Sequence, residues 1–352
     1  MFNWGIIGTG FVARKFVLGL RAAEDAHAVT VASHTAASAD KFAADFGLTS
    51  HGDNIAALLA APIDAVYIAT PPTAHRKAAL AAIAAGKPVL IEKPLAASLA
   101  DARAIVGAAH AAGVFAMEGV WTRFLPLFAA ARARLPELGE IRSLEASFGL
   151  ANTPDPADNQ FSAALGGGAL LHRGLYPLAL ALGLLGPAKL EASAATIGAS
   201  GADEDCTLLL RHASGALSTL RASLRAPLAN DLRIEGTHGF LHLETPVYRP
   251  FAARLTTISP AKRTSNTSPR FEFLRESTLA QSVQQRLTSL KRPAGQRFTR
   301  RFVGNGYHYE ADAVMRAVRA GHTESPEMPL ADSLAIAEII EAARTAWGTT
   351  RD

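Results

Sequence analysis

The chain begins with Trp4-Gly5-Ile6-Ile7-Gly8-Thr9-Gly10-Phe11-Val12-Ala13, a stretch that decides how it folds. An apolar run leads into two glycines and then into a segment that can be helical. In such a strand–turn–helix unit, Gly8 permits the tight turn and Gly10 lets a pyrophosphate approach the backbone. Ala13 lets helix and strand pack closely, and the helix N-terminus favours an anion. The stretch therefore predicts a phosphate cradle.

Strand and helix patterns then alternate as far as about residue 118. The later strands are expected at 29–33, 64–69, 88–91 and 114–117, and the helices at 38–46, 75–85 and 98–112. This alternation predicts a parallel sheet with right-handed crossovers. Ligands of such sheets bind beyond the C-terminal strand ends, where one ligand could touch several strands. We expect a dinucleotide cofactor to contact Gly8, Thr9, Gly10, Phe11, Val12, Ser33, His34, Thr70, Pro71, Pro72, His75, Glu92, Lys93 and Glu118.

Composition excludes several classes of protein. Of the 352 residues 49% are hydrophobic and 19% charged, so the chain should fold around a large core. No apolar run approaches the ~18 residues of a membrane span, and the first strand leaves no room for a signal peptide. Cys206 is the single cysteine, which excludes an internal disulfide and a cysteine metal cluster. We therefore expect a cytoplasmic protein without a metal centre or a membrane partner.

The net charge of +4 is distributed unevenly. Residues 260–303 hold ten Lys or Arg against two Asp or Glu, a local charge of +8, which leaves about −4 for the remainder. A basic stretch of this kind can bind nucleic acid, but no nucleic-acid motif accompanies it. We expect a solvated basic insertion and no nucleic-acid partner.

The end of the second strand bears on the choice of cofactor. It reads Ser33-His34-Thr35 and holds no carboxylate. Proteins built for NAD often have Asp or Glu here, which accepts hydrogen bonds from the ribose 2′-OH. A carboxylate would repel a 2′-phosphate, whereas Ser, Thr and His can donate to it. The tip therefore favours NADP over NAD.

The second half of the chain has a different pattern. Alternating runs at 140–148, 189–197, 205–211, 216–224 and 231–235 predict a mainly antiparallel sheet, so that the whole chain is α/β. Gly166-Gly167-Gly168 introduces a helix that carries His172 and Tyr176 on one face. A C-terminal helix at about 330–347 is expected to pack back on the body.

Together these motifs resemble the GFO/IDH/MocA family of nucleotide-dependent oxidoreductases over nearly the whole chain. The resemblance rests on the glycine turn, on Ala69-Thr70-Pro71-Pro72, on Glu92-Lys93-Pro94 and on the triple-glycine helix. The chain is most similar to the branch of dimeric dihydrodiol dehydrogenases and NADP-dependent D-xylose dehydrogenases, through segments 117–124, 306–311 and 324–326 and through Tyr176. The resemblance implies a Rossmann domain at 1–120, a substrate and oligomerisation domain with an open-faced sheet at 121–352, and homodimers or homotetramers.

The resemblance also implies hydride exchange between a nicotinamide and a sugar, cyclic diol or related carbonyl compound. Lys93 matches the family's catalytic lysine, and Tyr176 stands where this branch has a tyrosine that handles the proton. A nearby ammonium should lower the pKa of Tyr176. Trp121 and Phe148 are candidate walls of the substrate pocket or plain core residues. Arg123 is expected to hydrogen-bond cofactor or substrate, with a structural salt bridge as the competing interpretation.

One position departs from the branch, because His172 stands where an aspartate is usual. An imidazole can bond a hydroxyl or relay a proton, but it supplies no negative charge, and Lys93 should disfavour its protonation. His172 could be a replacement acid/base or the sign of weakened or lost activity. Arg173 adds positive charge and would suit an anionic substrate. The alternative function is therefore a cofactor-binding sensor or interaction protein without turnover.

Overall fold

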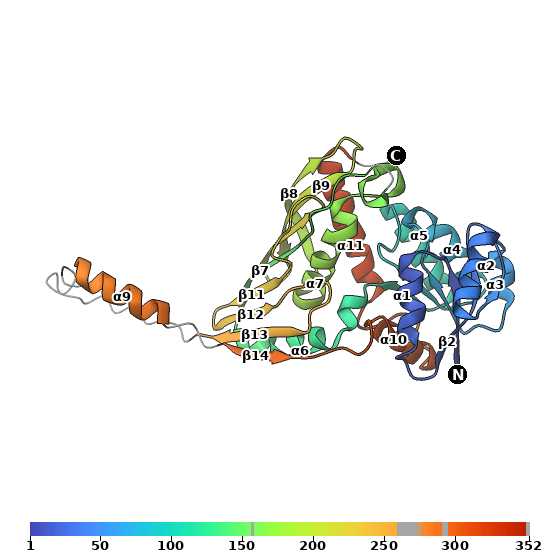
Figure 1. Ribbon diagram of the computed structural model, residues 1–352, viewed down its shortest axis with the longest axis horizontal. Helices are drawn as coiled ribbons and strands as arrows, with labels where there is room; N and C mark the ends of the chain where they lie inside the picture. The colour runs from blue at the N-terminus through green and yellow to red at the C-terminus, as the bar shows by residue number, and fades with distance from the viewer. Residues whose placement is uncertain (156–157, 259–272, 274–275, 291–294, 350–352) are drawn as a thin grey trace.

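The computed structural model describes residues 1–155, 158–258, 273, 276–290 and 295–349. Each half of the chain builds one sheet, and helices α7 and α11 lie between the two sheets (Figure 1). The α/β class expected from the sequence is confirmed. Among the described residues, no helix has the length and apolar character needed to cross a membrane.

The N-terminal sheet is parallel throughout, with the order β3-β2-β1-β4-β5-β6. Its strands are β1 (Phe2–Ile7), β2 (Ala26–Ala32), β3 (Thr49–Ser50), β4 (Ala65–Ile68), β5 (Val89–Glu92) and β6 (Ala116–Gly119). Its helices are α1 (Phe11–Leu20), α2 (Ala36–Phe46), α3 (Ile55–Ala60), α4 (Pro72–Ala84) and α5 (Leu99–Ala112). From β1 the chain adds β2 and β3 on one side and β4, β5 and β6 on the other. In sheets of this kind, a ligand-binding crevice lies at the C-terminal strand ends where the strand order changes direction.

Aromatic packing fixes the helix that follows the glycine turn. Phe16 of α1 stacks on Tyr67 of β4 with ring centroids 3.7 Å apart, and Trp4 of β1 meets Phe16 edge-on at 5.2 Å. All three side chains are fully buried. Aromatic pairs of this kind add about 0.5–1.5 kcal/mol beyond the burial of their area. The start of α1 is therefore held rigidly over the ends of the strands.

Within the described residues, the C-terminal sheet has eight strands in the order β14-β13-β12-β11-β7-β10-β9-β8. They are β7 (Ile141–Gly149), β8 (Ala188–Ile197), β9 (Asp203–His212), β10 (Leu217–Ser223), β11 (Leu232–Gly236), β12 (Gly239–Leu243), β13 (Ala252–Thr257) and β14 (Gln296–Thr299). The pairing is antiparallel except between β7 and β10, which run parallel. The expectation of a largely antiparallel sheet is confirmed.

One face of this sheet carries the helices. Leu144, Ile234 and Leu241 point inward and are fully buried, whereas the outer face presents charged side chains such as Glu145 and Arg233. The helices in the described part of this half are α6 (Pro126–Arg134), α7 (Leu175–Leu185), α9 (Thr278–Leu290), α10 (His308–Arg319) and α11 (Leu330–Ala346). Short turns of 3-10 helix lie at Trp121–Phe124, Leu135–Leu138, Asn159–Phe161 and Ala163–Leu165, and a π-helical turn lies at Leu170–Gly174.

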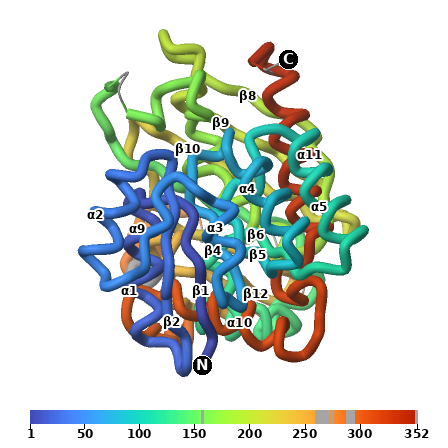
Figure 2. Tube along the Cα trace, turned by 90° about the vertical axis from the view of Figure 1, so that its right-hand side faces the viewer, coloured from blue at the N-terminus to red at the C-terminus, as the bar shows by residue number. Residues whose placement is uncertain are grey.

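The C-terminal helix returns to the first domain. Figure 2 shows α11 alongside α5, and Arg103 of α5 forms an ion pair with Glu338 of α11 at 2.9 Å. Leu330, at the start of α11, is buried in the hydrophobic cluster that packs against the N-terminal sheet. The two halves of the chain are therefore tied together by a segment that comes last in the sequence.

The basic stretch at 260–303 follows β13 and includes β14, and these two strands are neighbours at the edge of the sheet. Much of this stretch lies outside the described residues, including six of its ten basic residues: 262, 263, 270, 275, 291 and 292. Helix α9 within it stands apart from the body in Figure 1. The interpretation of the stretch as a solvated insertion stays a prediction.

Candidate active site

The glycine turn leaves room for a phosphate group. Gly8 has φ +110°, and a Cβ there would lie 2.5 Å from the Ala69 carbonyl oxygen, so only glycine fits. A Cβ on Gly10, at the N-cap of α1, would meet nothing within 4 Å. Thr70 lies beside this turn, since a Cβ on Gly8 would be 3.1 Å from the Thr70 nitrogen, and the Thr70 hydroxyl is buried without a protein partner. An open helix N-terminus and an unsatisfied hydroxyl beside the same turn fit a bound pyrophosphate, so these residues fit a dinucleotide.

The other predicted cofactor residues surround this turn. Phe11 is 73% exposed at the first position of α1, and Val12 follows it on the same helix. Pro71 caps α4, and Pro72 begins that helix at the end of β4. The Thr9 and Ser33 hydroxyls lie 3.1 Å apart, and the exposed His34 ring approaches the Ser33 hydroxyl at 3.5 Å. The tip of β2 is therefore a group of hydroxyl and imidazole side chains.

His75 has a different position from the one predicted. Its ring is fully buried, with Nε2 2.9 Å from the Thr70 carbonyl and Nδ1 2.9 Å from the Pro94 carbonyl. Burial lowers the pKa of His75. The side chain is therefore not a cofactor contact. It joins the turn after β4 to the turn after β5, and so it positions the loop that holds Lys93.

Lys93 lies where the two domains meet. Its ammonium donates to the His172 carbonyl oxygen at 3.3 Å and sits 4.9 Å above the centre of the Tyr176 ring. Burial lowers the pKa of Lys93, while the negative charges of Glu92 and Glu118 oppose that shift. Lys93, Tyr176 and the backbone of His172 thus come together, although 79 residues separate Lys93 from His172.

Aromatic side chains surround Tyr176. Trp121 donates from Nε1 to the Tyr176 hydroxyl at 3.4 Å, and Phe148 meets the Tyr176 ring edge-on at 5.8 Å. Burial, followed by the charge of Glu92, raises the pKa of Tyr176. The expectation that Lys93 would lower this pKa is therefore wrong, because the ammonium lies over the ring and desolvation of the hydroxyl dominates. Trp121 and Phe148 both contact Tyr176, and their expected role as walls of a substrate pocket stays a prediction.

A widened helical turn presents His172. The π-helical turn at Leu170–Gly174 comes just before Pro177, which has no N–H to donate to the preceding turn. This leaves a carbonyl of that turn free to accept from Lys93. Burial and the charge of Lys93 lower the pKa of His172 to about 4, so the imidazole is neutral near pH 7.

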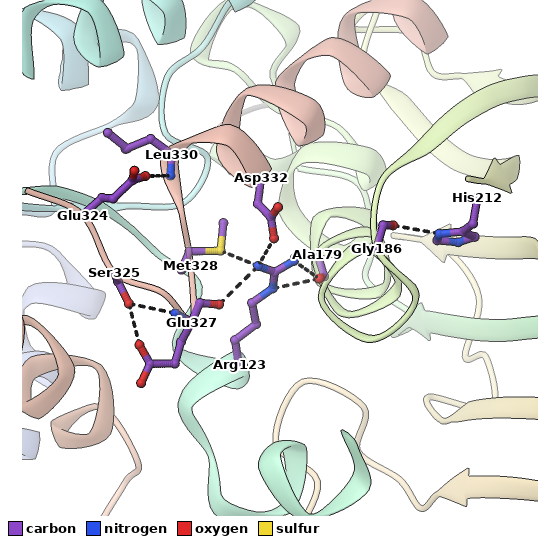
Figure 3. Close-up of polar contacts among 10 residues, drawn as sticks. All are labelled: Arg123, Ala179, Gly186, His212, Glu324, Ser325, Glu327, Met328, Leu330 and Asp332. Carbon is purple, nitrogen blue, oxygen red and sulfur yellow. Dashed lines mark hydrogen bonds and ion pairs between the residues drawn. The ribbon is translucent and has the colours of Figure 1, made fainter. Parts of the chain in front are cut away.

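Arg123 is a structural residue and not a cofactor contact. It is 3% exposed, and its Nε and Nη2 donate to the Ala179 carbonyl at 2.9 and 2.6 Å. Its Nη1 pairs with Asp332 at 2.6 Å and lies within hydrogen-bond distance of the Glu327 carbonyl and the Met328 sulfur, as Figure 3 shows. The structure supports the competing interpretation of Arg123 as a structural salt bridge, because its guanidinium binds Ala179 of α7 and Asp332 of α11.

Arg173 is also engaged within the protein. It is 4% exposed, and its Nη1 donates to the carbonyls of Leu150 and Ser223 while Nη2 donates to Gln160. A guanidinium occupied in this way offers little to an anionic substrate. Arg173 joins the ends of β7 and β10, and its expected contact with a substrate stays a prediction.

The carboxylates of Glu92 and Glu118 point into the interior and not into the crevice. The Tyr67 hydroxyl donates to Glu92 at 2.5 Å, and Glu118 accepts from the Leu95 N–H at 2.8 Å. Glu92 is 6% and Glu118 1% exposed. These two carboxylates support the Lys93 loop from behind, and the expected contact of the two residues with the cofactor stays a prediction.

Sequence reasoning missed several residues around the site. Tyr248 stacks on Phe148 at 4.9 Å, and Tyr307 stacks on Trp121 at 4.9 Å. Asp203 accepts from the Leu170 N–H at 2.7 Å and so caps the π-helical turn. Tyr307 lies in the segment 306–311 that was already singled out, so a signal for it existed. Tyr248 lies between two strands in a loop without a recognisable pattern.

Two family models match the chain. One, described as an oxidoreductase family with an NAD-binding Rossmann fold, matches residues 2–120, and the other, a GFO/IDH/MocA C-terminal domain, matches residues 128–242. Among curated proteins, the trans-1,2-dihydrobenzene-1,2-diol dehydrogenase of Mus musculus is 31% identical over 357 residues, covering 99% of this chain and 97% of the relative. The protein of the same name from Homo sapiens is 29% identical with the same coverage.

Solved structures agree in fold. The aldose-aldose oxidoreductase from Caulobacter crescentus gives a TM-score of 0.80 at 22% identity, covering 99% of this chain and 98% of the other. KijD10, a 3-ketoreductase from Actinomadura kijaniata in complex with NADP and TDP-benzene, gives 0.77 at 24% identity, covering 98% and 97%. The family models together span more than half of the residues, so this chain belongs to the GFO/IDH/MocA family of oxidoreductases.

Proposed function

We propose that this protein is an NADP-dependent oxidoreductase that exchanges a hydride with a sugar, cyclic diol or related carbonyl compound. One observation carries the proposal. The Lys93 ammonium lies over the ring of Tyr176 and beside the His172 carbonyl, at the C-terminal end of β5 and next to an open glycine turn. This arrangement supports the proposal, because dinucleotides bind beyond the C-terminal strand ends of a parallel sheet and a pair at this position could handle the proton.

The bound cofactor would supply or accept the hydride. Lys93 would hold a positive charge beside the reacting oxygen, and the Tyr176 hydroxyl would exchange the proton that accompanies hydride transfer. Trp121 and Phe148 would exclude water from this oxygen, since both are nearly buried against Tyr176. The neutral His172 would offer a hydrogen bond to a substrate hydroxyl.

The preference for NADP rests on the tip of β2. Ser33 and His34 can donate to a 2′-phosphate, and Ser33-His34-Thr35 contains no carboxylate to repel it. The 3-ketoreductase of similar fold has NADP bound. Competition titration of NADPH and NADH, followed by cofactor fluorescence, would test this preference, and equal affinities would refute it.

The proposed substrate class is supported by the relatives, which are named as dihydrodiol dehydrogenases, and by proteins of similar fold named as an aldose-aldose oxidoreductase and a 3-ketoreductase. We expect turnover of NADP with a diol or aldose from a panel that also contains dicarbonyls. Changing Lys93→Met should abolish that turnover and leave NADPH binding within about threefold of the wild type, because the phosphate cradle is untouched. Tight NADPH binding without turnover of any compound would instead favour the alternative function, a sensor without chemistry, for which the neutral His172 is the supporting observation.

The assembly and location are also proposals. We divide the chain into a cofactor domain at 1–120 and a substrate and oligomerisation domain at 121–352. We propose a homodimer or homotetramer in the cytoplasm. Light scattering coupled to gel filtration would give the oligomer size, and a monomer at assay concentration would contradict the proposed assembly.

A further inference from the structure

Trp121 contacts the Tyr176 hydroxyl through the indole N–H. Its Nε1 donates to the Tyr176 oxygen at 3.4 Å. An indole nitrogen can only donate, so the Tyr176 oxygen accepts in this bond and its own hydrogen is left for another acceptor. The bond is longer than the usual ~2.9–3.0 Å, so a small movement of the indole would break it. The groups that hold Trp121 in place therefore decide where the Tyr176 O–H points.

The turn that leads into helix α10 holds the Trp121 ring. Tyr307, at the N-cap of α10, stacks on the indole with ring centroids 4.9 Å apart and planes 11° from parallel. The backbone of Gly306 lies against the same ring, since a Cβ there would be 3.1 Å from Trp121 Cζ3. Stacked aromatic rings prefer a definite offset and spacing. Tyr307 therefore fixes the plane of the buried indole.

The same turn is joined to helix α1, whose N-terminus opens on the glycine turn. Asn305 Nδ2 donates to the Lys15 carbonyl at 2.7 Å, and Asn305 Oδ1 accepts from the Tyr307 N–H at 3.2 Å. Gly19 lets the two segments approach closely, because a Cβ there would lie 2.8 Å from Tyr307 Cβ. Figure 1 shows α10 beside α1. Contacts therefore run without a gap from α1 to the ring that stacks on the indole.

We propose that Tyr307 is a positioning residue that acts through Trp121: it keeps the indole N–H on the Tyr176 oxygen, so that the Tyr176 O–H is directed to the substrate. The inference rests on the proposed function and concerns its reductive direction. There the carbonyl carbon receives the hydride of the reduced cofactor, the Tyr176 O–H bond breaks, and the proton goes to the carbonyl oxygen to give an alcohol. The Tyr176 oxygen keeps the electron pair, and a proton from solvent restores the phenol.

The surroundings of Tyr176 suit a proton donor. Tyr176 is buried, and burial raises the pKa of its hydroxyl, so the phenol holds its proton before a substrate binds. The Lys93 ammonium, 4.9 Å from the ring centre, carries the charge opposite to that of the phenolate. The Trp121 N–H also stabilises the phenolate, because a hydrogen bond to an ionised oxygen is stronger than one to a neutral oxygen. Loss of this bond should therefore slow proton transfer more than it weakens substrate binding.

Nuclear magnetic resonance of the full-length protein would test the positioning role without any need for turnover. We would label tryptophan with ¹⁵N, assign the Trp121 indole N–H with the Trp121→Phe variant, and measure its hydrogen exchange with water. We expect exchange to be at least about tenfold faster in Tyr307→Leu. It should stay within about twofold of the wild type in Tyr307→Phe, which keeps the stacked ring. Tyr309→Leu is the matched control, because Tyr309 is half-buried on the same helix and its ring contacts His308.

A second variant displaces the Tyr307 ring without removing it. Gly19→Ala places a methyl group 2.8 Å from Tyr307 Cβ, so the turn must shift and exchange at the Trp121 indole should be at least about threefold faster. Gly107→Ala is its control, because Gly107 lies within helix α5 and a Cβ there meets nothing within 4 Å. Thermal unfolding would show which variants are folded at the temperature of the exchange measurement.

The outcomes separate this inference from the proposed function. Exchange within about twofold of the wild type in both Tyr307→Leu and Gly19→Ala, in folded protein, would overturn the positioning role even if the wild type turns over substrate. Faster exchange in both, with normal exchange in the controls, would support it, and a wild type without turnover would then count against the proposed function alone.

Where carbonyl reduction is found, its kinetics give a second readout. Tyr307→Leu should lower kcat at least about tenfold, with KM and the NADPH affinity within about threefold of the wild type, and Tyr307→Phe should restore kcat. An effect confined to KM, or a loss of kcat that Tyr307→Phe does not restore, would contradict the proposal.

Discussion

Replacing Arg123 with methionine should destabilise the protein without affecting its affinity for NADPH. The substitution keeps the apolar stem and removes the guanidinium that holds the Ala179 carbonyl and Asp332. The Ala179 carbonyl would lose two donors in the interior, which costs about 1–3 kcal/mol. Asp332 is 28% exposed and can be hydrated, so its loss of a partner should add only about 1 kcal/mol. We expect a total of about 3 kcal/mol, roughly a 150-fold change in the folding equilibrium.

Urea unfolding followed by tryptophan fluorescence would measure the loss, with Arg103→Met as the matched control. That control breaks an exposed ion pair to Glu338 and should cost less than about 1 kcal/mol. NADPH titration of both folded variants should give dissociation constants within twofold of the wild type. If Arg123→Met unfolded like the wild type yet bound NADPH more than about tenfold more weakly, the guanidinium would belong to the cofactor site and the reasoning from Figure 3 would fail.

Three further predictions concern the site. Gly8→Ala should weaken NADPH binding at least about tenfold, because a Cβ would lie 2.5 Å from the Ala69 carbonyl oxygen in a strained backbone conformation. Fluorescence titration measures the NADPH affinity, and an affinity equal to that of the wild type would contradict the prediction. Glu310→Gln should become more stable relative to the wild type as the pH rises above about 4.5, because the pKa of Glu310 is raised in the folded state and the wild type loses stability as the pH rises towards that pKa. Thermal unfolding of both proteins across pH measures this trend. A difference in stability that stays constant with pH would count against a protonated Glu310. His172→Asp should raise the pKa of Lys93 by adding a negative charge nearby, and a Lys93 titration unchanged by the substitution would show that the two side chains do not interact.

Much of the first domain could be predicted because its signals are local. The apolar strands and the glycine turn were expected within a few residues of β1, β2, β4 and β5, since period and turn chemistry act over short distances. The elements that were missed, α3, α10 and β13 among them, carry weaker patterns. Helix α10 is amphipathic, but its apolar face is recognisable only once α1 and Trp121 are known to pack against it.

The site was predicted less completely than the fold, because burial is not visible in a sequence. Lys93 and Tyr176 were selected by resemblance, and the structure brings them together. Arg123, Arg173 and His75 were selected by the same kind of reasoning, yet their polar groups are turned towards main-chain carbonyls. Whether a polar side chain faces a crevice or the core depends on its rotamer and on the packing of distant segments such as α11.

The buried charges around Lys93 limit how the site can be protonated. Glu92 and Glu310 both lie close to Gly119, since a Cβ there would be 3.5 Å from the Glu92 Cα and 3.5 Å from Glu310 Oε2. Two ionised carboxylates in one buried space repel each other strongly. Glu92 receives hydrogen bonds from Tyr67 and from the Lys93 N–H, whereas both oxygens of the fully buried Glu310 lack partners.

The negative charge therefore belongs on Glu92 and the proton on Glu310. That distribution leaves one carboxylate directly behind the loop that carries the Lys93 ammonium. The charge of Glu310 is one of the causes that raise the pKa of Tyr176. A neutral Glu310 removes that contribution, whereas burial, the largest cause, still holds the pKa of Tyr176 above its ordinary value.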